Sequence, residues 1–172
     1  PYPMADGSYL MRMSEEAITP YVDAARQHGV ELILDIQVGM ADPLAEVQRL
    51  APFLREPFVH LALDPEFAMR LRGGVPGQRI GSLDAAEVNA VQTWLAALVR
   101  EERLPPKMLI LHQFRPDMLT NTEHFEDTPG VERVIDMDGW GNDGVKLSHY
   151  EAFALASYAQ RPAIKLFYEW DV

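Results

Sequence analysis

Residues 58–67 read FVHLALDPEF, and this stretch decides the expected fold. Its side chains are almost all apolar from Phe58 to Leu63, and the run stops at Asp64. A nearly continuous apolar run is typical of a parallel strand that is covered on both faces. We therefore expect a strand of a parallel sheet here, with Asp64 and Glu66 lying on one face where the strand ends.

Four other segments share this pattern and are predicted to be strands of the same sheet. They cover residues 31–37, 107–114, 131–138 and 163–168. Helical patterns lie between them, and the first is expected to begin with Thr19 as N-cap and Pro20 as its first residue, and to stop at Gly29.

Two further helices carry start signals of their own. Asp42 and Pro43 repeat the cap-and-proline start for a helix over residues 43–54. Asp84 and Glu87 form a capping-box pair at the start of an amphipathic helix that reaches residue 104. A last helix is expected over residues 145–159.

Strands that alternate with helices predict an α/β fold with a parallel sheet. An open doubly wound sheet and a (β/α) barrel both fit, but no glycine-rich phosphate motif follows any strand. Polar residues at every strand end favour the barrel, whose sites are assembled there. Five strands cannot close a TIM-like barrel, so we expect residues 1–172 to be one domain, an incomplete barrel of about five βα units truncated at both ends.

The composition narrows the classes of partner. The length of 172 residues and the hydrophobic content of 48% are typical of one globular domain. The net charge of −11 argues against nucleic acid as a binding partner, because binding to the phosphate backbone depends on Lys and Arg. Because there is no cysteine, a disulfide framework and a thiolate zinc site are excluded. No apolar stretch approaches the ~20 residues of a membrane span, so we expect none in this segment.

Polar residues recur at the ends of the predicted strands. Since residues two apart in a strand share a face, several of them are expected to converge around one opening and to contact a small molecule or carbohydrate substrate. The full set is Asp35, Gln37, Asp64, Glu66, His112, Gln113, Asp136, Asp138 and Lys165.

Glycoside hydrolysis is the first chemistry that such a site supports. It needs one protonated carboxyl and one carboxylate on either side of the scissile bond. Glu66 is the expected acid because Asp64 would raise its pKa, and Asp138 or Asp136 is the expected partner. Trp140 and Tyr168 are candidates to stack on a sugar ring, although half-buried loop aromatics are an equally ordinary explanation for Trp140.

Other functions remain open from the same residues. The carboxylates and His112 suit a divalent metal ion in a hydrolase, although we expect no cofactor, since no metal-binding motif spacing accompanies them. Lys165, in an apolar segment, would be a Schiff-base lysine if its pKa were depressed. A barrel that binds a glycan or a cell-envelope component without catalysis is the remaining alternative.

The loop over residues 68–82 carries Arg70, Arg72 and Arg79 in an acidic chain. A solvated surface loop explains it most simply. A lid, or a site for an anionic substituent of a substrate, is the alternative.

The strings DIQVGMADPL, VHLALDPEF, PPKMLILHQF, VIDMDGWG and IKLFYEWD together resemble a family of bacterial proteins. The family occurs in actinobacteria and their relatives, and its members are often labelled lipoproteins or secreted proteins. The resemblance covers nearly the whole chain and brings no established activity. It implies an exported or cell-envelope location, with a cytoplasmic one as the alternative, and a likeness to glycosidase-type barrels.

Overall fold

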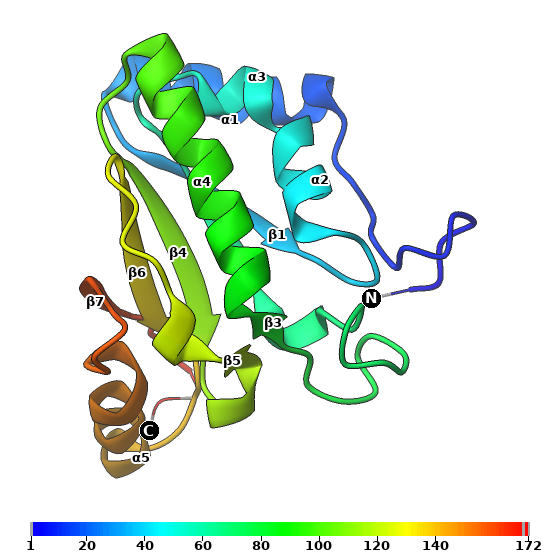
Figure 1. The fold of residues 1–172 in the computed structure, drawn as a ribbon, viewed down its shortest axis with the longest axis vertical. Helices are drawn as coiled ribbons and strands as arrows, with labels where there is room; N and C mark the ends of the chain where they lie inside the picture. The colour runs from blue at the N-terminus through cyan, green and yellow to red at the C-terminus, as the bar shows by residue number, and fades with distance from the viewer. Residues whose placement is uncertain (1, 170, 172) are drawn as a thin grey trace.

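Five parallel strands form the main sheet of the computed structural model, which describes residues 2–169 and 171 (Figure 1). They lie in the order β1, β2, β4, β6 and β7, so each pairs with the next long strand along the chain. Their bounds are Leu32–Gln37, Val59–Asp64, Lys107–Gln113, Val131–Met137 and Arg161–Ile164. The predicted α/β fold with a parallel sheet is confirmed, but β1 and β7 are open edges and the described residues form no closed barrel.

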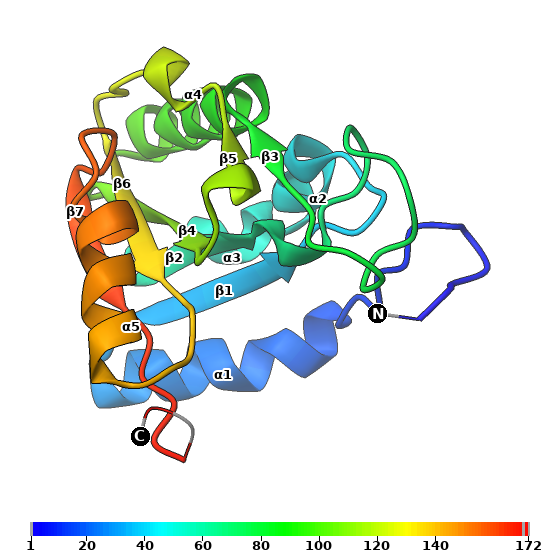
Figure 2. The ribbon, with the colours of Figure 1, turned by 90° about the horizontal axis from the view of Figure 1, so that it is seen from below.

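The α-helices of the described residues all cover one face of the sheet. They are α1 (Glu15–His28), α2 (Pro43–Arg49), α3 (Ala51–Leu54), α4 (Ala85–Glu102) and α5 (Asp143–His149). Leu63 of β2 and Leu111 of β4 share one buried core with Ile18, Val47 and Val88 of the helices. Figure 1 shows α4 running along the front of the sheet, and Figure 2 shows α1 beside β1 and α5 beside β6.

Short elements fill the connections. Three 3-10 turns, η1, η2 and η3, cover Pro65–Phe67, Pro116–Met118 and Thr122–His124, and one π-helical turn, η4, covers Tyr150–Ala154 directly after α5. The two-residue strands β3 (Leu83–Asp84) and β5 (Leu119–Thr120) pair with each other in parallel. This small ladder joins the loop before α4 to the loop after β4.

The opposite face of the sheet carries no helix among the described residues, and we call it the helix-free face. Ala62, Ile110 and Val134 form a small buried cluster there. In β1, every second residue is exposed, beginning with Ile33, while its neighbours pack against the helices. The edge strand therefore presents half of its side chains to solvent on this face.

The helix boundaries confirm two predicted starts and correct one. Asp42 caps α2 ahead of Pro43, and Asp84 forms the predicted capping box with Glu87 at the start of α4. The start predicted for the first helix is wrong.

The first helix begins at Glu15, because Ser14 accepts a hydrogen bond from the N–H of Ala17 and thereby caps it one turn earlier. The carboxylates of Glu15 and Glu16 in the first turn also stabilise this start, because they interact favourably with the positive N-terminal end of the helix dipole. Pro20 consequently lies inside the helix, where it lacks one N–H donor.

Two later elements also differ from the prediction. The helix expected over residues 145–159 starts at Asp143 and becomes a π-helical turn at Tyr150. The last strand is shifted toward the N-terminus and ends at Ile164, so that Lys165 follows the strand instead of lying within it. No helix within residues 2–169 and 171 is long and apolar enough to cross a membrane.

Candidate active site at the strand ends

Seven ionisable side chains gather near the C-terminal ends of the strands on the helix-free face. The parallel arrangement brings them together, because all five strands end at the same edge of the sheet. We call this set the strand-end cluster: Asp35, Asp64, Glu66, His112, Asp136, Asp138 and Lys165.

His112 lies at the centre of the strand-end cluster and is only 7% exposed. Its Nε2 is 3.1 Å from Oδ2 of Asp35 on β1, across the one intervening strand β2. Its Nδ1 is 3.1 Å from Oδ2 of Asp136 and 3.4 Å from Oδ2 of Asp138. Neither of the Nδ1 contacts has the direction of a hydrogen bond, so this nitrogen is buried next to negative charge without a directed partner.

The surrounding carboxylates keep His112 protonated at neutral pH. Burial alone would lower its pKa, but the contacts with Asp136 and Asp35 outweigh it and raise the pKa to about 10. The cluster therefore contains a buried imidazolium, which compensates part of the negative charge of three aspartates.

Lys165 supplies the second positive charge. Its Nζ lies 2.9 Å from Oδ1 of Asp138, which is itself well buried. Burial lowers the pKa of Lys165, but the contact with Asp138 and the charges of Asp35 and Asp64 together raise it by more, and the net direction is upward. A Schiff-base lysine needs the opposite direction, so the depressed pKa considered for Lys165 is wrong.

Glu66 belongs to the strand-end cluster, but it does not lie on strand β2 as predicted. Strand β2 ends at Asp64, and Glu66 lies in the 3-10 turn η1, whose N-terminus Asp64 caps by accepting a hydrogen bond of 2.9 Å from the N–H of Glu66. The alternation of strand side chains therefore does not place Glu66. The tight turn that follows Pro65 does so instead.

The carboxyl groups of Asp64 and Glu66 are both biased toward their protonated forms. Burial is the main cause for each, and it raises the pKa of Asp64 and of Glu66. Asp64 and Asp138 raise the pKa of Glu66 further by repulsion between like charges. Glu66 is half-buried, so it combines a raised pKa with access to solvent.

A lysine that the sequence reading missed fixes the two segments after β6 and β7. Lys146 of α5 is buried, and its Nζ donates to the backbone oxygens of Gly139 at 2.8 Å and Lys165 at 2.6 Å. Asp171 completes the contact at 3.0 Å from the same Nζ. These bonds hold the residues that follow Asp138 and Lys165. In the sequence, Lys146 has no signal that separates it from an exposed helix lysine.

The remaining predicted residues lie outside the strand-end cluster. Gln37 is exposed at the end of β1. Gln113 lies on the helix-covered face, 1% exposed, where its side-chain oxygen accepts a hydrogen bond of 2.8 Å from the Tyr158 hydroxyl, so it does not face the strand-end cluster. Trp140 and Tyr168 are 69% and 89% exposed, so Trp140 is not a half-buried loop aromatic.

No group of three or more His, Asp or Glu side chains has an arrangement able to hold a metal ion, as far as residues 2–169 and 171 are concerned. In the strand-end cluster, His112 lies between Asp35 on one side and Asp136 and Asp138 on the other, and Lys165 contacts Asp138.

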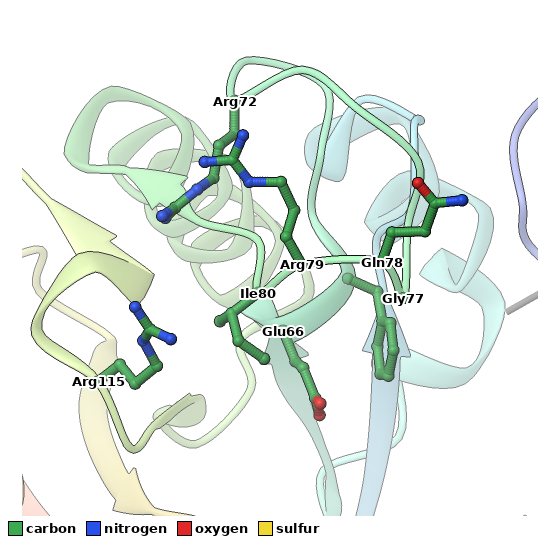
Figure 3. A pocket seen from close by; sticks show the side chains of 8 residues that line it. Glu66, Arg72, Gly77, Gln78, Arg79, Ile80 and Arg115 are labelled. Atoms are coloured by element: carbon green, nitrogen blue, oxygen red, sulfur yellow. The ribbon is translucent and has the colours of Figure 1, made fainter.

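A pocket of about 480 Å³ lies next to the cluster and shares Glu66 with it (Figure 3). Arg72 and Arg79 of the loop over residues 68–82 line it, together with Arg115 from the loop that follows β4. The arginine-containing loop noted in the sequence therefore borders the candidate active site. Arg115 was not singled out, because it lies 36 residues beyond Arg79 in the chain.

Comparisons with known proteins add no family to this description. The chain matches no model of a known protein family, and a search of curated proteins found no similar sequence. The resemblance to actinobacterial lipoproteins and secreted proteins, and the exported location that it implies, stay predictions.

Proposed function

We propose that the protein is a glycoside hydrolase with a barrel-type active site, in which Glu66 is the general acid and Asp138 the partner carboxylate. The observation that carries the proposal is the position of Glu66, a partly accessible carboxyl in the turn after β2 that lines a pocket beside the strand-end cluster. Burial and the charges of Asp64 and Asp138 raise its pKa. Cleavage of a glycosidic bond needs one carboxyl group that donates a proton and a second one that acts as a carboxylate.

The topology supports a barrel-type site. In a doubly wound sheet the strand order reverses, and ligands bind at the point of reversal. Here the strands follow one another in chain order and the helices cover one face only, as in successive units of a (β/α) barrel. We therefore propose that the described sheet is an incomplete barrel, and that its strand ends hold the active site.

In the proposed reaction, Glu66 donates its proton to the leaving glycosidic oxygen as the bond to the sugar breaks. Asp138 faces the sugar carbon as a carboxylate, and its charge is held in place by Lys165 at 2.9 Å and by the imidazolium of His112. Whether Asp138 attacks the sugar itself or activates a water molecule depends on the separation of the two carboxyl groups in the complex with substrate.

Exposed aromatic side chains support a carbohydrate as the substrate. Trp140 follows the strand-end residue Asp138 by two positions, and its ring is largely free of protein contacts. Aromatic rings pack against the apolar faces of planar groups with little loss of conformational entropy. Tyr168, three residues after Lys165, is similarly exposed.

The test compares wild-type protein with Glu66→Gln on a panel of aryl glycosides and oligosaccharides. Loss of a general acid should lower kcat/KM by roughly 100-fold or more for substrates with a poor leaving group. Glycosides with a dinitrophenyl leaving group need no protonation, so Glu66→Gln should cleave them at nearly the wild-type rate. Glu101→Gln, an exposed change of the same type on α4, is the control and should behave as wild type.

Three outcomes separate the alternatives. If Glu66→Gln lowers kcat/KM equally for substrates with good and with poor leaving groups, Glu66 is not the general acid. Binding of oligosaccharides without turnover of any substrate would support the non-catalytic glycan-binding barrel instead. Activity that depends on added Mn²⁺ or Zn²⁺ and survives Glu66→Gln would favour the metal-dependent hydrolase.

A further inference from the structure

The pocket next to Glu66 is rich in positive charge although the chain as a whole is strongly acidic. The net charge of the chain is −11, yet three arginines, Arg72, Arg79 and Arg115, line this one pocket. Its volume of about 480 Å³ is within the range of small-molecule sites. The three guanidinium groups outnumber the two carboxyl groups at this pocket, those of Glu66 and Asp117, so positive charge is in excess there.

One carboxylate serves two of these arginines. Arg72 contacts the side chain of Asp117 and donates to its backbone oxygen at 2.9 Å. Arg115 donates from Nε to Oδ1 of the same aspartate at 3.0 Å. Asp117 thus holds both guanidinium groups at the pocket but neutralises only one of their two charges.

Arg79 has no ion pair or side-chain hydrogen bond with any residue of the described chain, and it is exposed. Its five N–H donors are therefore free to bind an oxyanion. Arg79 leaves the loop close to Gly77, which has a φ of 85°, a conformation that favours glycine. In Figure 3 the side chains of Arg79 and Arg72 end near each other, whereas the carboxylate of Glu66 points away from both.

The position of Glu66 links this pocket to the strand-end cluster. Glu66 lines the pocket, and its carboxyl group is close enough to Asp64, Asp138 and Lys165 for their charges to shift its pKa. A ligand that spans Glu66 would thus place one part among the arginines and another part over the carboxylates. Three guanidinium groups suit a planar or tetrahedral oxyanion, which they bind with paired N–H donors.

We propose that this pocket is a subsite for an anionic substituent of the substrate, so that the preferred glycan carries a carboxylate or a sulfate on the sugar next to the scissile bond. This inference rests on the proposed glycosidase function for its substrate class, but the binding that it requires is measurable without catalysis. Arg79 supplies the free donor group, and Arg72 and Arg115 add positive charge that Asp117 compensates only in part.

Calorimetric binding to the Glu66→Gln protein tests the proposal, since hydrolysis of the probe is then removed. The probes are trigalacturonate, its fully methyl-esterified form, and a sulfated tetrasaccharide prepared from carrageenan. Charge-assisted hydrogen bonds are worth about twice neutral ones, so we expect trigalacturonate to bind about tenfold more tightly than its methyl ester. Adding Arg79→Gln should remove most of this difference.

Arg100→Gln is the matched control, because Arg100 is an exposed arginine on α4, away from the pocket, and the charge change is the same. It should leave the preference for the charged probe intact. Preference for the sulfated probe that depends on Arg79 would identify sulfate as the anion. Equal binding of charged and uncharged probes, or a preference that Arg79→Gln does not alter, would overturn the proposal.

The outcomes also separate this inference from the proposed function. If the wild-type protein hydrolyses neutral glycosides but binds no anionic probe preferentially, the proposed function is supported and the proposed anionic subsite is contradicted. If an anionic probe binds through Arg79 but no glycoside is hydrolysed, the anionic subsite is supported and the hydrolase function is contradicted.

Discussion

Buried charges lie on both faces of the sheet, but they are bonded differently. On the helix-covered face, Arg133 is 3% exposed and donates to the backbone oxygens of Tyr158 and Glu126 and to the side chain of Gln92. On the helix-free face, Nδ1 of His112 is buried without a directed hydrogen bond within the described chain, and Oδ1 of Asp138 has only the ion-pair contact with Lys165 at 2.9 Å, also without hydrogen-bond geometry.

This difference separates structural charges from candidate functional ones. Lys107, which is fully buried, resembles Arg133, because its Nζ donates to the backbone oxygens of Val59 and Glu56. Because the donors of Lys107 and Arg133 are already bonded within the protein, these side chains are not available to bind a ligand. The strand-end cluster instead brings like charges together and leaves donors and acceptors incomplete, at a cost in stability that a binding site can recover on binding.

The largest expected effect is on the helix-covered face. Arg133→Met leaves several buried acceptors without a donor, so we expect the free energy of unfolding to fall by about 3–5 kcal/mol. Arg161→Met is the control, since Arg161 is exposed and its ion pair with Glu132 should contribute no more than about 1 kcal/mol. Urea denaturation of both variants measures the difference. A loss below 1 kcal/mol for Arg133→Met would show that its bonds are not structural.

The second prediction concerns the pH dependence of stability at the cluster. The pKa of folded His112, about 10, is above the ordinary value of 6.5, so its stabilising effect is complete below pH 6.5 and disappears as the pH rises toward 10. The free energy of unfolding of the wild-type protein should exceed that of His112→Gln by on the order of 2–4 kcal/mol at pH 6. This difference in free energy should disappear by pH 10. His124→Gln, with an exposed ring, should show no such gap. Denaturation at several pH values gives the answer, and a gap that is independent of pH would contradict it.

Lys146 tests whether the segments after β6 and β7 depend on a structural charge. Lys146→Met removes the donor to the oxygens of Gly139 and Lys165, and we expect a loss of about 1–3 kcal/mol in unfolding free energy. Hydrogen exchange should also become faster in the segment that contains Gly139. Unchanged exchange there would mean that Lys146 does not hold the end of β6.

The smallest effect on stability is expected for Trp140→Ala. The ring is 69% exposed, so unfolding free energy should change by no more than about 0.5 kcal/mol. Under the proposed function, KM for oligosaccharides should rise by up to roughly tenfold through lost stacking. Tyr21→Ala, exposed on α1, should change neither quantity. An unaltered KM would exclude Trp140 from the substrate site.

Local signals in the sequence predicted local structure well. The caps at Asp42 and Asp84 form as expected, because a cap depends only on residues within one helical turn. The continuous apolar runs predicted parallel strands, and the three central strands β2, β4 and β6 are buried along most of their length, whereas the edge strands β1 and β7 are not. By contrast, the first helix is capped by Ser14 and begins at Glu15, one turn before the Thr19-Pro20 pair that also fits a helix start.

Placement of the site residues depended on where each strand ends. The alternation of side chains along β4 puts His112 and Gln113 on opposite faces, and only His112 joins the strand-end cluster. For Glu66 and Lys165 the rule fails, since both residues lie just beyond their strands. Element ends are set by competing turns, and these are weakly encoded in a short window of sequence.

By itself, the sequence determined the α/β class, the parallel strands, the helix caps at Asp42 and Asp84 and the edge at which polar residues collect. These follow from periodicity and capping, which act over a few residues. Only the tertiary structure decided that His112 contacts Asp35, 77 positions away, that Lys146 is buried, and that Arg79 and Arg115 share a pocket. Contacts between distant segments depend on how strands and loops pack against one another, and no local pattern specifies that packing.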